Sequence, residues 1–392
     1  MTSPALVGVT AAGARQPARR PAWVEVDLQA VVANVAALGA LAAPAALCAV
    51  VKADAYGHGS VPVALTALGA GATWLGVAMA AEGAVLRAAG IDAPIIVLSE
   101  PSPEEVADVV ALGLRPTVYR LDTVAALADA VATAGVTPVP VHLKVDTGMR
   151  RVGADPSDVP ALALAIQHRP ELELEAVWTH CAVADEPGHP FTGTQARRLD
   201  AVLADLAASG VDAPMVHAAN SAATIDQPGL HHDLVRCGIT VYGLDPSPAL
   251  HGRLALRAAL ALKARVGMVK VVRAGEAVSY GLRRPLAVDS VVATVPLGYA
   301  DGVPRRLSEV GGHVLLGGRR CPMVGTITMD QLLVDCGPAA TAPTVTPGDE
   351  VVLIGEQHGQ RIGADEWAAR LGTISYEVVC AISPRVPRRY LE

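Results

Sequence analysis

Between residue 23 and about residue 245, short apolar runs alternate with segments of helical periodicity. The runs predicted to form strands are residues 47–52, 74–79, 95–99, 116–119, 139–146, 174–180, 214–220 and 234–239. Helices are predicted between them, for example at residues 102–112, 121–134 and 195–208. Alternating strands and helices favour a parallel sheet, and eight such units close a (β/α)8 TIM barrel. A doubly wound open sheet is the alternative fold.

Beyond residue 248 the pattern changes to strands without intervening helices. Examples are residues 259–272, 291–296, 313–316 and 350–354, which glycine-rich turns separate. The length of 392 residues also favours two domains. We therefore expect an α/β protein with a TIM barrel over residues 21–247 and a mainly-β C-terminal domain over residues 248–392. Residues 1–20 are expected to form a disordered tail, because their arginines follow a weak apolar patch, the reverse of a signal peptide.

Charge and composition narrow the range of partners. The net charge of −7 and the charged fraction of 18% provide no basic surface for nucleic acid or a membrane. The uncharged stretch 28–51 is long enough to span a bilayer, but Asn34, Gly39 and Pro44 interrupt it, which favours a helix and then a buried strand. The six cysteines show no CxxC pair or zinc-like spacing, so we expect no metal site and reduced thiols in the cytoplasm.

Polar residues gather where the predicted barrel strands end. They are Lys52, Lys144, Asp146, Arg151, His180, Asn220, Ser221 and Arg236. Active sites of TIM barrels lie at these carboxyl ends, and a mostly cationic set suits an anionic ligand. Lys52 follows the apolar run 49–51, and burial would lower its pKa and free the amine for Schiff-base chemistry. An isolated lysine in this position more often extends to the surface.

The segment 49–59, AVVKADAYGHG, resembles the cofactor-lysine motif of alanine racemases, which are fold-type III pyridoxal-phosphate enzymes. Further segments resemble that family in the same order: PAWVEVDL (21–28), HLKVDTGMRRVG (142–153), THCAVADE (179–186), HAANSAAT (217–224), VRCGITVYGL (235–244), residues 279–281, LGYADG (297–302), TITMDQ (326–331) and GTISYEVVCAISPRVPR (372–388). The resemblance runs from about residue 21 to the C-terminus. It implies a racemase that interconverts L- and D-alanine and supplies D-alanine for peptidoglycan, acting as a cytoplasmic homodimer with active sites shared between subunits.

The resemblance also assigns the two bases. Lys52 would carry pyridoxal 5'-phosphate and act on the D face, and Tyr280 would act on the L face from the partner subunit. Two bases are needed because a planar carbanion changes configuration only if one group removes the proton and another returns it to the opposite face. His180 and Arg236 would stabilise the tyrosine anion, since the reference pKa of tyrosine is about 10.

The remaining implied roles concern the cofactor and the substrate carboxylate. Arg236 would face the pyridine nitrogen, and arginine cannot donate its proton to it. The phosphate would bind the backbone at Gly238 and Ile239, the helix start at Asn220 and Ser221, and the hydroxyls of Tyr56 and Tyr376. The substrate carboxylate would bind Arg151 and the Met329 backbone N–H, with Asp330 orienting this arrangement. Lys144 is either carbamylated or paired with Asp146, and the sequence leaves both open.

The sequence departs from the family pattern at two positions, and four other functions are compatible with parts of it. Arg150 stands where small residues are common, so which of Arg150 and Arg151 reaches the substrate is open. Thr328 replaces a frequent cysteine at the substrate-access side. Broad-specificity and serine racemases share this framework. A pyridoxal-phosphate decarboxylase is disfavoured by Arg236 and Tyr280, and a non-catalytic cofactor-binding barrel by the residues after 248.

Overall fold

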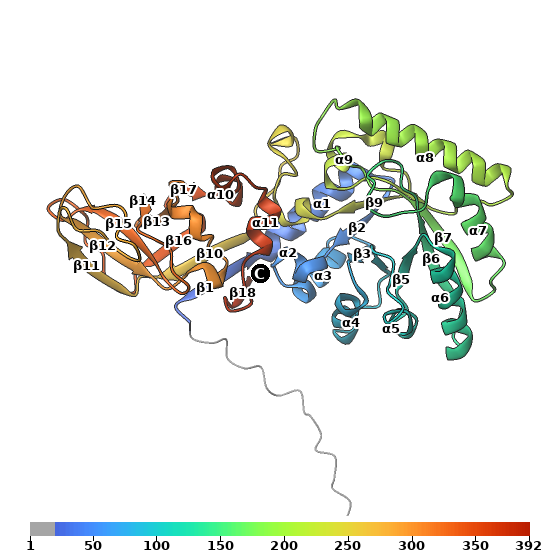
Figure 1. Cartoon of the computed structure of the whole chain (residues 1–392), viewed down its shortest axis with the longest axis horizontal. Coiled ribbons are helices and arrows are strands. Elements are labelled where there is room, and N and C mark those ends of the chain that lie inside the picture. Colours follow the sequence, from blue (N-terminus) through green and yellow to red (C-terminus); the bar gives the residue numbers. More distant parts are fainter. Residues whose placement is uncertain (1–19) are drawn as a thin grey trace, which may run out of the picture. The chain divides into compact units, whose positions relative to one another are not determined.

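The computed structural model describes residues 20–392, so the tail expected over residues 1–20 lies outside the described residues except for Arg20. The described chain forms two compact units. The barrel unit comprises residues 25–260, 363–382 and 390–392, and the β unit comprises residues 20–24, 261–362 and 383–389. Figure 1 shows the helices and strands of each unit in the colours of the sequence.

Eight parallel strands form the centre of the barrel unit. They are β2 (Ala46–Val50), β3 (Trp74–Val77), β4 (Ile95–Val97), β5 (Arg115–Val118), β6 (Val139–Lys144), β7 (Leu172–Trp178), β8 (Val216–His217) and β9 (Leu234–Cys237). Neighbours pair in the order β8-β7-β6-β5-β4-β3-β2-β9. A parallel bridge between Asn220 and Arg236 joins the two ends of this order, and the Arg236 N–H donates to the Ala219 carbonyl at 3.0 Å. The expected barrel is therefore confirmed over the open sheet.

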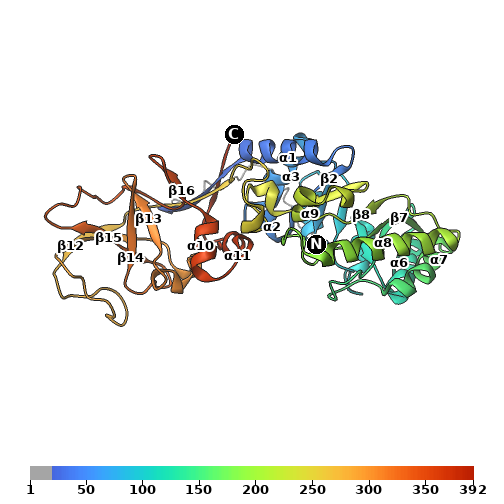
Figure 2. The same cartoon turned by 90° about the horizontal axis from the view of Figure 1, so that it is seen from above.

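Helix α1 (Leu28–Ala42) precedes the first barrel strand, and the other helices of this group follow barrel strands in sequence. These are α2 (Lys52–Tyr56), α3 (Ser60–Gly69), α4 (Ala80–Ala88), α5 (Val106–Ala111), α6 (Leu121–Ala134), α7 (Val159–Gln167), α8 (Pro190–Ala208) and α9 (Ser221–Asp226). Short 3-10 turns lie at Pro156–Asp158, Pro228–Leu230, Ile239–Tyr242 and Pro248–Leu250. The Asp27 side chain caps α1 by accepting the Ala30 N–H at 2.9 Å, and α1 lies beside α3 (Figure 2).

The uncharged stretch 28–51 forms α1 and then β2, as predicted. Pro44 follows the end of α1, where a proline cannot continue a helix. Strand β2 is buried over most of its length, which explains its continuous apolar sequence. Among the residues described, no helix combines the length and the hydropathy needed to cross a membrane.

The β unit is built mainly from antiparallel strands, as the sequence predicted. The strands are β1 (Ala22–Asp27), β10 (Leu260–Arg265), β11 (Met268–Val272), β12 (Ser290–Val295), β13 (His313–Leu316), β14 (Arg319–Val324), β15 (Leu332–Pro338), β16 (Glu350–Gln357), β17 (Gln360–Ile362) and β18 (Arg388–Leu391). They pair in the order β11-β12-β15-β14-β13-β16-β10-β1-β18, and β17 pairs with β16. Two 3-10 turns, Tyr299–Asp301 and Arg305–Ser308, join β12 to β13.

Two late helices, α10 (Ala364–Leu371) and α11 (Ser375–Cys380), belong to the barrel unit. Helix α11 packs against α2, and the ring centroids of Tyr376 and Tyr56 lie 6.1 Å apart. Residues close to the C-terminus therefore lie beside residues close to the start of the barrel. The domain boundaries 21–247 and 248–392 remain predictions.

Candidate active site

A cavity of about 710 Å³ lies at the carboxyl ends of the barrel strands. The expected site residues that line it are Lys52, Tyr56, Lys144, Arg151, His180, Asn220, Ser221, Arg236, Gly238, Ile239 and Tyr376. Tyr280 and Met329, the other two expected residues, belong to the β unit. Residues at or after the ends of five barrel strands, together with Tyr376 of α11, thus meet around one space, as the barrel topology predicts.

Lys52 begins a turn of unusual backbone geometry. The four residues after it, Ala53 to Tyr56, all have φ between 52° and 54°, which is the left-handed region. Such a conformation costs about 1–2 kcal/mol for each non-glycine residue, so surrounding contacts must hold it. Glu82 supplies two of them, because its carboxylate accepts the Ala53 N–H and the Ala78 N–H, each at 2.7 Å. No motif or spacing in the sequence predicted this role for Glu82.

The Lys52 amine is set up for nucleophilic chemistry. Burial lowers its pKa, the positive charge of Arg151 lowers it further, and the carboxylate of Glu82 opposes the shift. A lysine with a lowered pKa exposes more of its neutral amine at physiological pH, and that is the form which attacks a carbonyl.

Arg236 is fully enclosed, and the polar contacts of its guanidinium are to neutral groups. It donates to the Thr179 carbonyl at 2.8 Å, to the Ala218 carbonyl at 3.0 Å and to Nδ1 of His217 at 2.7 Å. A longer contact of 3.4 Å reaches Nδ1 of His180. Burial lowers the pKa of Arg236 to about 10, so the guanidinium remains charged at neutral pH. A buried cation among neutral partners favours an anionic ligand.

Trp178, at the end of β7, contacts three of the charged or polar groups. The Lys144 ammonium lies 4.1 Å and the Arg236 guanidinium 4.6 Å from its ring centre, and the His217 ring stacks on it at 5.3 Å. Both cations gain from the electron-rich face of the indole. Sequence reasoning missed Trp178, although it directly precedes Thr179 and His180 in a recognised motif.

Two further titratable groups of this region, Lys144 and His180, have lowered pKa values. The pKa of Lys144 falls to about 7 through burial, with Arg236, Arg151 and Lys52 adding to the effect and Asp146 opposing it. The pKa of His180 lies well below its usual range, mainly through burial and then through the same cations. His180 is therefore neutral at physiological pH and Lys144 is divided between its charged and neutral forms.

The end of the cavity expected to hold phosphate is tightly packed. Ser221 begins α9, and its hydroxyl oxygen accepts the Gly238 N–H at 2.8 Å. Asn220 caps the same helix by accepting the Ala223 N–H at 3.0 Å. A Cβ at Gly238 would lie 2.4 Å from the Tyr56 hydroxyl oxygen, so only glycine fits there. The position of the Tyr56 hydroxyl thus depends on this glycine.

The loop after β6 decides which arginine faces the cavity. The Asp146 carboxylate accepts the N–H groups of Gly148 at 2.9 Å and Arg150 at 3.0 Å, which closes a tight turn. Arg150 occupies the left-handed region at φ 59°, and the next residue, Arg151, lines the cavity. The Asp146 carboxylate thus binds backbone N–H groups of the loop, while the Lys144 ammonium lies over the Trp178 ring.

The residues expected to come from the second subunit lie on neighbouring segments of the β unit. The Tyr280 side chain is 76% exposed and Met329 is 52% exposed. Two hydrogen bonds join their segments: the Ser279 hydroxyl donates to the Thr326 carbonyl at 2.6 Å, and the Thr326 hydroxyl donates to the Tyr280 carbonyl at 2.8 Å. The two segments therefore present one exposed surface.

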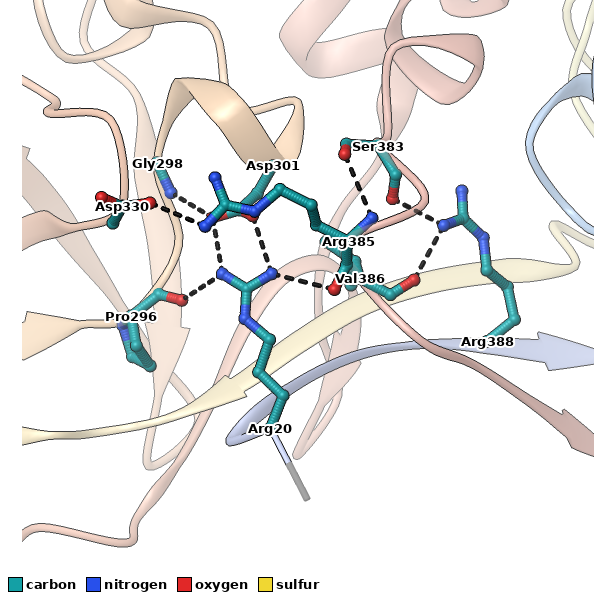
Figure 3. A network of polar contacts seen from close by, with 9 residues as sticks. All are labelled: Arg20, Pro296, Gly298, Asp301, Asp330, Ser383, Arg385, Val386 and Arg388. Atoms are coloured by element: carbon teal, nitrogen blue, oxygen red, sulfur yellow. Dashed lines mark hydrogen bonds and ion pairs between the residues drawn. The ribbon is translucent and has the colours of Figure 1, made fainter. Parts of the chain in front are cut away.

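A network of polar contacts centred on Asp301 reaches Asp330, the residue after Met329 (Figure 3). The two carboxylate oxygens of Asp301 each accept an Arg20 N–H at 2.7 Å, and one also accepts the Gly298 N–H at 3.0 Å. Arg385 lies 3.6 Å from Asp301 and donates to Asp330 at 2.7 Å. The Ala300 N–H in turn donates to the Met329 carbonyl at 3.0 Å. The Asp301 turn thus contacts Met329 through the Ala300 N–H and Asp330 through Arg385.

Two family models together match most of the chain. The family model described as "Alanine racemase, N-terminal domain" matches residues 26–246, and "Alanine racemase, C-terminal domain" matches residues 259–390. The chain is 49% identical over 374 residues to an alanine racemase of Symbiobacterium thermophilum, covering 95% of this chain and 97% of that protein. It is 40% identical to the solved alanine racemase of Streptomyces lavendulae, with a TM-score of 0.89, covering 95% and 97% of the two chains. The solved Bacillus anthracis alanine racemase with bound L-Ala-P is 38% identical, with a TM-score of 0.88 and 96% coverage of each chain.

Proposed function

The chain belongs to the alanine racemase family, and we propose that it interconverts L-alanine and D-alanine with pyridoxal phosphate carried by Lys52. The observation that carries this proposal is a lysine of lowered pKa in a cavity that also contains Lys144, Arg151 and Arg236. This cavity combines a nucleophilic amine with one cation for the ring nitrogen of the cofactor, Arg236, and one for a substrate carboxylate, Arg151.

The residues present fit the cofactor. Arg236 is a buried cation among neutral partners, and Gly238 leaves room for the Tyr56 hydroxyl at the end where the phosphate would bind. Ser221, Ile239 and Tyr376 line the same cavity. When bound, pyridoxal phosphate withdraws electrons from the Cα atom of an amino acid and makes its proton acidic. Arg236 would present N–H donors to the ring nitrogen but no transferable proton, because it stays charged at neutral pH.

Proton transfer requires groups on both faces of Cα. Burial lowers the pKa of Lys52, which favours the neutral amine, and this amine would accept a proton on one face. We propose that Tyr280 of a second copy serves the other face, and its 76% exposure leaves the phenol accessible to that copy. The neutral His180 ring would stabilise the tyrosine anion through its free N–H. The working form would be a homodimer with two shared sites.

The substrate carboxylate would bind Arg151 on the barrel side and the Met329 N–H on the partner side. Lys144 would hold Arg151 in place as a carbamate: the neutral amine attacks carbon dioxide, an N–C bond forms and one proton leaves. The pKa of about 7 supports this step, because the neutral amine is available at physiological pH. Asp330 would orient the Met329 segment through Arg385.

Two further parts of the proposal concern the cell. We propose that the product D-alanine enters bacterial wall precursors and that the protein acts in the cytoplasm. Both follow from the family resemblance.

A chiral assay of the purified protein tests the reaction. L-alanine should yield D-alanine and the reverse, with serine and larger amino acids converted more slowly. Comparable rates on several amino acids would replace the proposal with a broad-specificity racemase. Release of carbon dioxide from the substrate, or no turnover at all, would reject racemisation.

A mixing experiment tests the shared site. Lys52→Ala and Tyr280→Phe are each expected to be inactive, and equal amounts are mixed under conditions in which subunits exchange. A mixed dimer has one site with both defects and one site with neither. Random pairing makes about half of the dimers mixed, so roughly a quarter of all sites should recover activity. No recovery, with exchange verified by an affinity tag, would place both residues in the site of a single chain.

A further inference from the structure

A row of hydrogen-bonded side chains runs from Arg236 through the interior of the barrel. Nδ1 of His217 accepts from Arg236 at 2.7 Å, Nε2 of His217 lies 3.0 Å from Nδ1 of His142, and Nε2 of His142 lies 2.9 Å from the Glu175 carboxylate. These residues come from β9, β8, β6 and β7. The His142 ring also lies 5.6 Å from the Trp74 ring on β3. Since β3 and β6 are not neighbours in the sheet, this contact crosses the barrel interior.

Each hydrogen bond of this row can have only one direction. A guanidinium donates and never accepts, so Nδ1 of His217 is unprotonated and its proton lies on Nε2. That N–H donates to Nδ1 of His142, which places the His142 proton on Nε2 as well. The last N–H donates to the Glu175 carboxylate, which only accepts. Both rings are neutral, because burial lowers the pKa of each, in His217 to well below its usual range.

The backbone directs Glu175 towards this row. The pairing of β6 with β7 places Val141 opposite Leu174 and His142 opposite Ala176, so the register passes over Glu175 as a bulge. Bulges redirect a side chain relative to the regular alternation of a strand. The Glu175 carboxylate also lies 3.5 Å from Nε of Arg115, and its side chain is 22% exposed, whereas His142 and His217 are fully buried.

We propose that Glu175 and His142 are positioning residues that act through His217 to fix the hydrogen-bond polarity and orientation of Arg236. Without the carboxylate, His142 could move its proton to Nδ1, and His217 would then present an N–H to the guanidinium. Two donors would face each other, and Arg236 would have to turn away. Glu175 also supplies the negative charge that the direct partners of Arg236 do not carry.

Neutron diffraction of the perdeuterated protein with its cofactor tests the polarity directly. Deuterium is expected on Nε2 of His142 and of His217, and none on Nδ1 of either ring. Deuterium on Nδ1 of either ring would overturn the proposal. This measurement does not depend on the reaction. A wrong assignment of the hydrogen-bond directions can therefore be distinguished from a wrong assignment of the racemase function.

The variants test the consequence, and this part rests on the proposed function. Glu175→Met is expected to lower kcat about tenfold with little change in KM, the scale of one charge-assisted hydrogen bond. It should also raise side transamination per racemisation turnover. Loss of folded protein alone would reduce both reactions equally and leave this ratio unchanged. Glu175→Gln keeps an acceptor oxygen and should restore most of kcat and the ratio.

Glu173→Met is the matched control, because Glu173 lies on the same strand with an exposed side chain. It should behave as wild type in kcat and in the transamination ratio. A wild-type ratio in Glu175→Met, or the same change in Glu173→Met, would overturn the positioning role.

Discussion

The two sets of site residues differ in their surroundings. Those of the barrel unit lie around a cavity in which burial and neighbouring cations lower the pKa values of Lys52, Lys144 and His180. Those of the β unit, Tyr280 and Met329, are mostly exposed. Groups that need an altered pKa thus occur where burial can alter it. Groups proposed to serve another subunit remain at the surface, where a second copy can reach them.

The largest effect on the racemisation rate is expected from substitution of Lys52, which lies in the cavity of the barrel unit. Lys52→Ala should reduce racemisation by about 10⁴-fold or more, since it removes both the attachment point and one base. Borohydride reduction of the wild-type protein, followed by peptide mapping, should find the cofactor on Lys52. A label on Lys144, whose pKa is also lowered, would show that burial alone does not identify the reactive lysine.

The buried charge of Asp301 is expected to stabilise the β unit, in which the exposed residues Tyr280 and Met329 lie. Asp301 is fully buried, and Asp301→Asn leaves the charge of Arg20 without its partner. We expect the free energy of unfolding to fall by about 3 kcal/mol, measured in guanidinium chloride. The control Asp330→Asn breaks an exposed pair with Arg385 and should cost less than about 1 kcal/mol. Equal losses in the two variants would contradict the assigned importance of burial.

Arg150 and Arg151 are neighbours in the chain, but only Arg151 lines the cavity, so their substitutions should differ in effect. Arg151 lines the cavity, so Arg151→Ala should lower kcat/KM for alanine by roughly ten- to hundredfold, mainly through KM. Arg150→Ala is the matched control, and its kinetics should stay within about twofold of wild type. The reverse result would assign the substrate carboxylate to Arg150.

Burial of Lys144 is expected to cost stability in a way that depends on pH. Its pKa is lowered from 10.5 to about 7, so between these pH values the unfolded chain binds more protons than the folded protein, and wild-type stability rises with pH. Lys144→Met removes this dependence. In carbon-dioxide-free buffer it should be more stable than wild type at pH 7, and the difference should shrink as the pH rises and vanish towards pH 10.5.

Lys270→Met serves as the control for this measurement, since Lys270 is exposed on β11 of the β unit. Its stability relative to wild type should not change with pH over this range. A pH-independent difference for Lys144→Met would show that its ammonium is solvated in the folded protein.

Local sequence predicted much of the fold and part of the site. The apolar runs gave all eight barrel strands, because each run is buried by the helices that flank it. Lys52 was identified as a strand-end lysine from its neighbours 49–51. The helices α10 and α11 were not assigned to the barrel, because no local pattern shows which unit a helix packs against.

The sequence by itself determined the order of strands and helices, the residue types at the strand ends and the family to which they point. Only the tertiary structure decided that Trp178 lies under two cations, that Glu82 holds the left-handed turn and that Glu175 reaches His142 through a bulge. The physical reason is that strand formation depends on neighbours along the chain. The pKa, burial and hydrogen-bond direction depend on groups that are distant in sequence and meet only when the barrel closes.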